Sequence, residues 1–247
     1  MQGLSAAKLM SAWEVGLNQH PLQRAVTLLA AAEPDLPREE LYKLSVGERD
    51  ARLLTLREHT FGPQLNSLTT CPGCNERLEL TLDVSDIRAR APSSADEPGR
   101  ALSVCVADYE VHFRLPNSLD LLAIAGSEDT SQSRQLLFQR CVVTARHKEA
   151  DCSADLLPPD VMDEIVVRMA QTDPQADVHL AFCCPRCSHE WQGVFDIVSF
   201  FWSEIAAWAL RILKEVHTLA RAYGWREADI LAMSPWRRQC YLELLGG

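Results

Sequence analysis

Hydrophobic residues recur every three or four positions near the N-terminus, which is the spacing of one face of an α-helix. Leu22, Val26 and Leu29 follow this spacing, and Pro21 suits the first position of their helix. The pattern therefore predicts a helical segment over residues 1–66 that includes a short helix at residues 39–44.

The next expected helix begins at a capping box. Ser45 can cap the first turn while Glu48 lies three residues later, and the helix is expected to reach about His59. Its sequence is dense in charge and includes Arg49 and Arg57. This charged helix is a candidate contact for a partner protein.

The last 50 residues are also predicted to be helical. A stripe of apolar residues at three- and four-residue steps predicts a long helix over residues 199–223, and Gly224 is suited to end it. Two shorter helices are expected after it, at residues 227–233 and 235–245.

The central part of the chain mixes alternating and helical patterns. Alternation of polar and apolar residues predicts strands at 76–84, 177–182 and 189–197. A hairpin turning at Asp108 is expected from residues 101–107 and 109–115, after a polar loop at 91–100. Helices are expected between these strands, at residues 118–125, 132–145 and 159–171.

Two Cys-Pro-x-Cys motifs carry the candidate chemistry of this central part. Cys71 and Cys74 form one motif, and Cys184 and Cys187 form the other. Each motif directs two thiolates to one point, and four thiolates are a ligand set for tetrahedral zinc. We predict one structural zinc ion, because four protein ligands leave no open position for water or substrate.

These elements together predict an α+β, mostly helical fold. It contains a split zinc ribbon with an inserted hairpin and helices, flanked by N- and C-terminal helical segments. The expected division is residues 1–66, 67–197 and 198–247.

Other interpretations of the cysteines stay open. Cys183 and His189 lie close enough in sequence to replace a neighbouring ligand. A Cys-Pro-x-Cys pair also occurs in dithiol oxidoreductases, where it begins a helix. The remaining cysteines lack ligand spacing and are expected to be small buried residues: Cys105, Cys141, Cys152 and Cys240.

Composition and charge restrict the classes of function. The chain has 247 residues and a net charge of −10, which disfavours broad binding to nucleic-acid phosphates. Its most apolar stretch, residues 197–213, contains Glu204 and Arg211 and is shorter than the roughly 20 residues of a membrane span. Nine cysteines and a first segment unlike a secretory signal indicate the reducing cytoplasm.

The sequence shows no phosphate-binding loop, nucleophile elbow or paired histidine motif, so we expect no enzyme activity. Trp225, Trp236 and Arg237 are candidate partner-binding residues, because tryptophan and arginine often anchor protein interfaces. Internal packing of the tryptophans is the simpler alternative, and a small nucleic-acid patch is the other.

The chain resembles the T4-type baseplate hub assembly chaperone family of contractile phage tails and related injection systems. The likeness runs in order through most of the sequence. It is carried by residues 13–32, 45–62, 69–84 (TTCPGCNERLELTLDV), 113–125 (FRLPNSLDLLAIA), the CPRCSHEW motif that starts at Cys184, and residues 222–245.

This resemblance implies a non-enzymatic protein that helps to assemble the hub or baseplate in the bacterial cytoplasm. Its partners would be baseplate, hub or other tail proteins, and it would act either as a transient chaperone or as a component of the finished particle. A zinc-ribbon nucleic-acid factor and a dithiol oxidoreductase are the rival classes.

Overall fold

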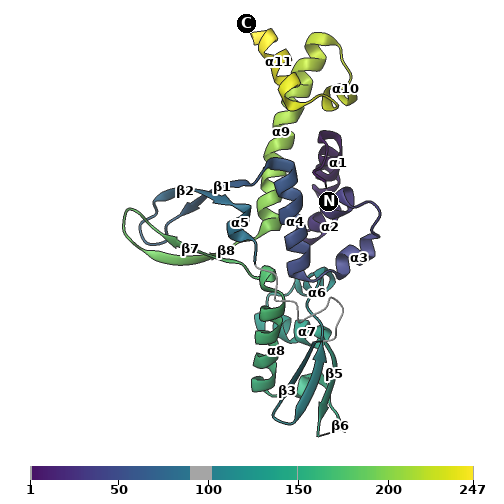
Figure 1. Ribbon diagram of the computed structural model, residues 1–247, viewed down its shortest axis with the longest axis vertical. Coiled ribbons are helices and arrows are strands. Elements are labelled where there is room, and N and C mark those ends of the chain that lie inside the picture. Colours follow the sequence, from purple (N-terminus) through teal and green to yellow (C-terminus); the bar gives the residue numbers. More distant parts are fainter. Residues whose placement is uncertain (1, 90–101, 149, 247) are drawn as a thin grey trace. The chain divides into compact units, whose positions relative to one another are not determined.

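The computed structural model describes residues 2–89, 102–148 and 150–246 (Figure 1). Helices predominate in this part of the chain and the strands form small antiparallel sheets, so the predicted α+β, mostly helical class is confirmed. The loop expected at residues 91–100 lies outside the described residues. The division into residues 1–66, 67–197 and 198–247 stays a prediction.

The chain folds into two compact units. The first consists of Met1–Pro37, Leu53–Pro63 and Asp196–Gly247. The second consists of Arg38–Arg52 and Gln64–Phe195.

The first unit is helical in all its described elements. It contains α1 (Ala6–Gly16), α2 (Pro21–Ala32), the second half of α4 (Val46–Phe61), α9 (Ile197–Tyr223), α10 (Glu227–Leu231) and α11 (Pro235–Gly246).

Helix α9 forms the centre of this unit. Asp196 caps its first turn by accepting hydrogen bonds from the backbone N–H groups of Val198 and Ser199. The predicted end is confirmed, since Gly224 follows the helix with a left-handed φ of +69°. The buried face of α9 packs against α1 and α10 and contributes most of the core of the unit, formed by Met10, Ala209, Ile212, Val216, Leu219 and Ile230.

Two arginines of the charged helix α4 are buried rather than offered to a partner. In the first unit, Arg57 is 2% exposed and donates to both carboxylate oxygens of Glu204, at 2.8 and 2.6 Å. In the second unit, Arg49 is buried and donates to the Ser118 hydroxyl. The predicted cap of α4 is present, because the Glu48 N–H donates to the Ser45 hydroxyl.

The second unit contains all the described strands. They are β1 (Gln64–Thr70), β2 (Arg77–Asp83), β3 (Leu102–Val106), β4 (Tyr109–Phe113), β5 (Val142–His147), β6 (Ala150–Asp151), β7 (His179–Cys183) and β8 (Glu190–Val194). The helices of the unit are α3 (Arg38–Lys43), the first half of α4, α5 (Val84–Ile87), α6 (Ser118–Ile124), α7 (Thr130–Cys141), α8 (Pro159–Thr172) and two short 3₁₀ turns.

Strands β3–β6 form one antiparallel sheet in that order, which we call the inserted sheet. The predicted hairpin is present as β3 and β4 and turns at Ala107 and Asp108. The helix predicted over residues 132–145 is wrong in its last part, because α7 ends at Cys141 and β5 follows. The β-branched run Val-Val-Thr that begins β5 favours a strand beside β4.

A hydrophobic core stabilises the inserted sheet. Helix α8 supplies Val161 and Ile165, which are fully buried and belong to the same core cluster as Val111 and Phe113 of β4. The helix predicted over residues 159–171 is thereby confirmed, and its apolar stripe packs on the sheet.

A buried carboxylate lies next to this core. Asp120 is 0% exposed and accepts hydrogen bonds from Arg114 at 2.5 Å, from Arg140 at 2.9 Å and from the Asn117 N–H at 3.0 Å. Burial alone would raise the pKa of Asp120, but these donors lower it below its usual range. The carboxylate therefore links α6, the end of β4 and α7 as a charged group.

Two hairpins, β1–β2 and β7–β8, make up the rest of the strand structure, and we call them the ribbon arm (Figure 1). In both hairpins residues alternate between half-buried and exposed, as the sequence predicted for strands β2, β7 and β8. Strand β1 was not expected, since residues 64–66 belong to the segment predicted to be helical and no strand was predicted at residues 67–70.

Candidate metal centre

Each Cys-Pro-x-Cys motif forms the turn of one hairpin. In the first motif, the Asn75 N–H donates to the Cys71 carbonyl and the Cys71 N–H donates to the Glu76 carbonyl, both at 2.9 Å. Asn75, the residue after the second cysteine, has a left-handed φ of +59°. Asparagine tolerates this conformation better than most residues other than glycine.

The second motif repeats this geometry. The Ser188 N–H donates to the Cys184 carbonyl at 2.8 Å, and the Cys184 N–H donates to the His189 carbonyl at 2.9 Å. Ser188 has a φ of +56°. Two stretches of sequence about 110 residues apart therefore form the same turn, and each turn presents two sulfurs.

The four sulfurs meet at one point. The Sγ atoms of Cys71, Cys74, Cys184 and Cys187 all lie within 4.8 Å of one another. Two cross-hairpin pairs, Cys71–Cys187 and Cys74–Cys184, are each 3.6 Å apart. Ligands 2.3 Å from a tetrahedral zinc ion would lie about 3.8 Å apart, so the two 3.6 Å pairs have nearly the spacing that such an ion requires.

The electrostatics of the cluster also suit a cation. Burial alone would raise the pKa of Cys184, but N–H groups of Cys187 and Arg186 and the neighbouring thiols lower it to about 7. The His189 N–H lowers the pKa of Cys187, yet hydrogen bonds with the other thiols and burial raise it to about 12. Because like charges repel, the four thiols cannot all be ionised together unless a positive ion lies between them.

The alternative ligands lie outside this cluster. Cys183 is exposed, and His189 stacks on Trp191 with ring centroids 6.1 Å apart. Each motif is followed by a strand rather than by a helix, so neither has the helix N-terminus that activates a redox cysteine. In the part of the chain that the structure describes, the four-cysteine group is the cluster able to hold one metal ion.

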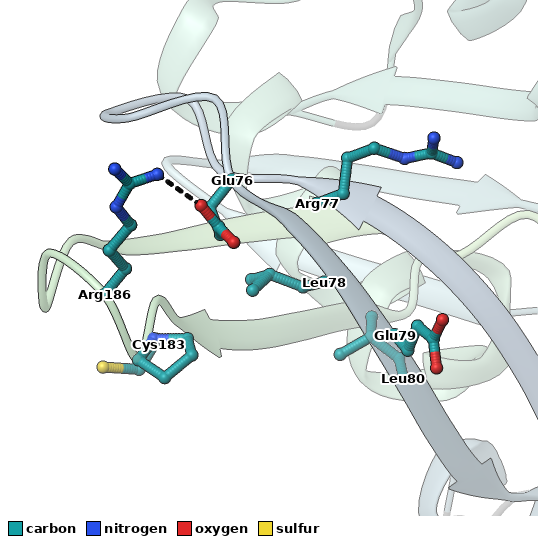
Figure 2. Close-up of a pocket in the computed structure, with 8 residues that line it drawn as sticks. Glu76, Arg77, Leu78, Glu79, Leu80, Cys183 and Arg186 are labelled. Atoms are coloured by element: carbon teal, nitrogen blue, oxygen red, sulfur yellow. Dashed lines mark hydrogen bonds and ion pairs between the residues drawn. The ribbon is translucent and has the colours of Figure 1, made fainter.

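An open pocket of about 640 Å³ lies beside the four-cysteine cluster, between the two hairpins (Figure 2). Leu78 and Leu80 of β2 line it together with Pro185 of the second motif. At its rim Arg186 forms an ion pair with Glu76 at 2.5 Å, which joins one hairpin to the other. Both side chains are exposed, so solvent screens the ion pair and it contributes little to stability.

The candidate partner-binding residues lie at the C-terminal end of the first unit. Trp236, the tryptophan of α11, is 77% exposed. Arg237 lies over the ring of Tyr241, with the guanidinium carbon 5.8 Å from the centroid. Trp225 is half-buried, since it stacks on Tyr223 at 4.4 Å and meets Tyr241 edge-on. Of these three candidate residues, Trp236 and Arg237 are therefore the two whose side chains are most accessible to a partner.

The remaining cysteines differ in burial. Cys141 is buried, and burial together with the nearby charge of Asp120 raises the pKa of its thiol to about 11. Cys152 and Cys240 are half-buried. Cys105 is exposed, so the expectation that it is buried is wrong. It lies on edge strand β3 opposite Glu110, on the outward face of the sheet.

The described helices include none that is both long and apolar enough to cross a membrane. This finding includes the 27-residue α9, whose apolar stretch suggested a buried helix in the sequence.

The fold and the cysteine cluster define an α+β, mostly helical protein with a site able to bind one metal ion. A family model described as T4 bacteriophage base plate protein matches residues 24–202, which is well over half of the chain. The protein therefore belongs to this family of phage baseplate proteins, as the resemblance predicted. No curated protein and no solved structure matches the chain.

Proposed function

We propose that the protein is a non-enzymatic assembly chaperone or hub component of a phage-like contractile injection system. The observation that carries this proposal is the family match, which includes residues of both units. The protein would work in the bacterial cytoplasm while the baseplate is built, and it would contact other baseplate, hub or tail proteins.

We further propose that one structural zinc ion is bound by Cys71, Cys74, Cys184 and Cys187. Sulfur spacing, N–H groups that donate to the sulfurs and matching turns support this ligand set. Zinc would supply the positive charge that lets four thiolates lie together. With four protein ligands it would have no position for substrate, which supports a structural role and the absence of catalysis.

The partner surface that we propose is the exposed face of α11. Trp236 and Leu244 are 77% and 72% exposed and lie two turns apart on this helix. Arg237 adds a positive charge beside them. Exposed tryptophan and arginine in one place are typical of the residues that contribute most to protein binding. The occupant would be a hub or tail protein of the particle.

Fractionation during particle assembly tests this function and separates its two forms. The tagged full-length chain is expressed with the other particle genes, and assembled particles are sedimented from the lysate. A chaperone would stay in the supernatant with unassembled hub or tail proteins, whereas a component would sediment in fixed ratio to the baseplate. Recovery of nucleic acid alone, with no particle protein in either fraction, would overturn the proposal.

A double variant, Trp236→Ala with Arg237→Ala, tests the proposed partner surface against the wild type. We expect it to fold and to bind metal as the wild type does, but to recover less of the partner. Equal recovery would place the contact on another surface.

A further inference from the structure

Strand β3 forms an edge of the inserted sheet that lacks the usual protection. It pairs with β4 on one side, and no described strand pairs with its other side. Natural sheets protect such an edge with charge, proline or a bulge, because free N–H and C=O groups attract another strand. Leu102–Val106 contains none of these. The opposite edge is protected, since β6 has only two residues and one of them is Asp151.

The turn at the end of β3 fixes which backbone groups point toward β4. Ala107 and Asp108 have left-handed φ values of +49° and +64°, as in the two-residue turn that joins tightly paired strands. Such a turn makes Val106 and Tyr109 a hydrogen-bonded pair. The Lys148 N–H donates to the Asp108 carbonyl at 3.1 Å, so Asp108 faces β5 and the next residue, Tyr109, faces β3.

Ser103 and Cys105 consequently turn their N–H and C=O groups to the open side of β3. Hydrogen-bonded residues alternate along an antiparallel strand, so these two lie between residues that bond to β4 and do not themselves bond to it. Both residues are exposed, and neither makes a backbone hydrogen bond to another described residue on this side. Two donors and two acceptors are therefore free to bind a further strand.

We propose that this edge pairs with β3 of a second copy of the chain, in antiparallel orientation and centred on Val104. Ser103 of each copy would form a hydrogen-bonded pair with Cys105 of the other copy. This register uses all four outward groups of each strand. It joins the two inserted sheets into one continuous sheet around a two-fold axis, the commonest symmetry of protein dimers.

The sequence of β3 matches its own reverse, which favours a second copy as the partner. Leu-Ser-Val-Cys-Val alternates apolar and small residues symmetrically about Val104. In the proposed register Leu102 lies opposite Val106 of the second copy, and Val104 lies opposite Val104. Ser103 lies opposite Cys105 on the other face of the sheet. Every cross-strand pair thus joins compatible side chains, and such pairs stabilise antiparallel sheets.

Charge also favours a contact between two copies at this edge. Each chain carries a net charge of −10, so two copies repel one another at acidic surfaces. Strand β3 has no charged residue, and the carboxylate of Asp108 in the turn beside it pairs with Lys148 at 3.6 Å. Repulsion is therefore smallest where an uncharged strand meets its copy. The proposal depends neither on the metal nor on the proposed function.

Sedimentation of the full-length protein under reductant tests the contact. We expect the wild type to sediment with twice the mass of one chain and Cys105→Pro to sediment as a single chain. Proline at this position removes an N–H that points away from β4, so the sheet keeps its own hydrogen bonds. Cys105→Ser retains the N–H and is the matched control, which should remain a dimer. A wild type that is monomeric at its highest soluble concentration would overturn the proposal, and so would a dimeric Cys105→Pro.

Cross-linking tests the register and does not require the proline variant to fold. The double variant Ser103→Cys, Cys105→Ser moves the thiol to the other member of the proposed pair. When it is mixed with wild type, its thiol should lie opposite Cys105 with the Cα atoms about 5.5 Å apart, within reach of a disulfide. In either protein alone, the equivalent Cα atoms would lie about 8 Å apart, which is too far.

The double variant is labelled with heavy nitrogen, mixed with wild type, mildly oxidised and digested with trypsin. We expect a disulfide between one labelled and one unlabelled copy of peptide 101–114, with a yield at least several-fold higher than in either protein alone. Equal yields in the mixture and in the separate proteins would overturn the proposal. Absence of the cross-link from all three samples would overturn it too.

Discussion

The ribbon arm and the inserted sheet lie in the same unit but differ in what stabilises them. The inserted sheet buries Val111, Phe113, Val161 and Ile165 against one another. In the ribbon arm, the residues in the buried class are Leu65 and the two cysteines Cys71 and Cys184. A two-stranded hairpin is marginal by itself in water. The comparison teaches that strands with so small a hydrophobic core need another source of stability. In the ribbon arm the four-cysteine cluster can supply it by joining the two hairpins.

The largest effect is expected when the metal is removed, because the ribbon arm should then lose its folded structure. Structural zinc sites contribute on the order of 10 kcal/mol to folding, so chelation should open residues 64–83 and 179–194. Residues 102–113 and 142–147 should keep their protection, because their core does not depend on metal. Hydrogen exchange with and without chelator measures both.

Cysteine variants provide the matched comparison for this experiment. Cys71→Ser should lose protection in the ribbon arm without chelator, whereas Cys105→Ser, at an exposed cysteine of the inserted sheet, should behave as wild type. Equal loss of protection in the arm and the sheet would contradict the claim that the two regions are stabilised differently.

A cavity in the inserted sheet should have the second largest effect. Phe113 is 1% exposed, so Phe113→Ala should lower the free energy of unfolding of the sheet by about 3–5 kcal/mol. Zinc content should not change. Val143→Ala, at a position 61% exposed on the neighbouring strand β5, is the control and should change stability by about 0.5 kcal/mol or less. Loss of zinc in the Phe113 variant would show that the arm depends on the core of the sheet.

Removing the buried charge next to the sheet should cost somewhat less. Asp120→Asn leaves Arg114 and Arg140 without their carboxylate and should lower stability by about 3 kcal/mol near neutral pH. The exposed pair of Asp163 with Arg134 supplies the control Asp163→Asn, which should have little effect. Chemical denaturation of the variants measures the difference.

The same carboxylate predicts how stability depends on pH. The pKa of Asp120 is lower in the folded protein than the ordinary value of 3.8, so the unfolded chain binds its proton first. Its contribution is therefore present above about pH 4 and is lost as the pH falls through the lowered pKa. The Asp120→Asn variant should lose less stability in acid than the wild type, and an unchanged acid dependence would contradict this assignment.

The smallest effect on stability is expected at the exposed end of α11. Trp236→Ala should change the free energy of unfolding by about 0.5 kcal/mol or less, because the side chain has few internal contacts to lose. Trp225→Ala should cost more, since its ring stacks on Tyr223 and Tyr241. Thermal unfolding of both variants makes the comparison, and equal losses would mean that Trp236 is packed inside the protein.

Much of the fold and the candidate site could be predicted from the sequence because these features are local. Helix α9, its end at Gly224 and helix α8 follow from apolar spacing and from a residue suited to left-handed backbone. The cysteine motifs predicted that four particular residues would meet, and their sulfurs lie within 4.8 Å of one another.

The features that could not be predicted from the sequence depend on contacts with residues far along the chain. Strand β1 contains mostly polar residues and is a strand because β2 pairs with it. Residues 142–145 extend a helical pattern, yet pairing with β4 makes them a strand. Arg57 seemed to be part of a charged surface, but Glu204 lies where it can neutralise the buried guanidinium. Periodicity cannot show such contacts.

The central claim is that four cysteines bind one zinc ion, which joins the two hairpins of the ribbon arm. Elemental analysis of protein purified without chelators tests it most directly. The account predicts one zinc per chain in the wild type and in Cys105→Ser, and loss of the metal in Cys71→Ser. A wild-type protein that is folded and reduced but contains no zinc would contradict it.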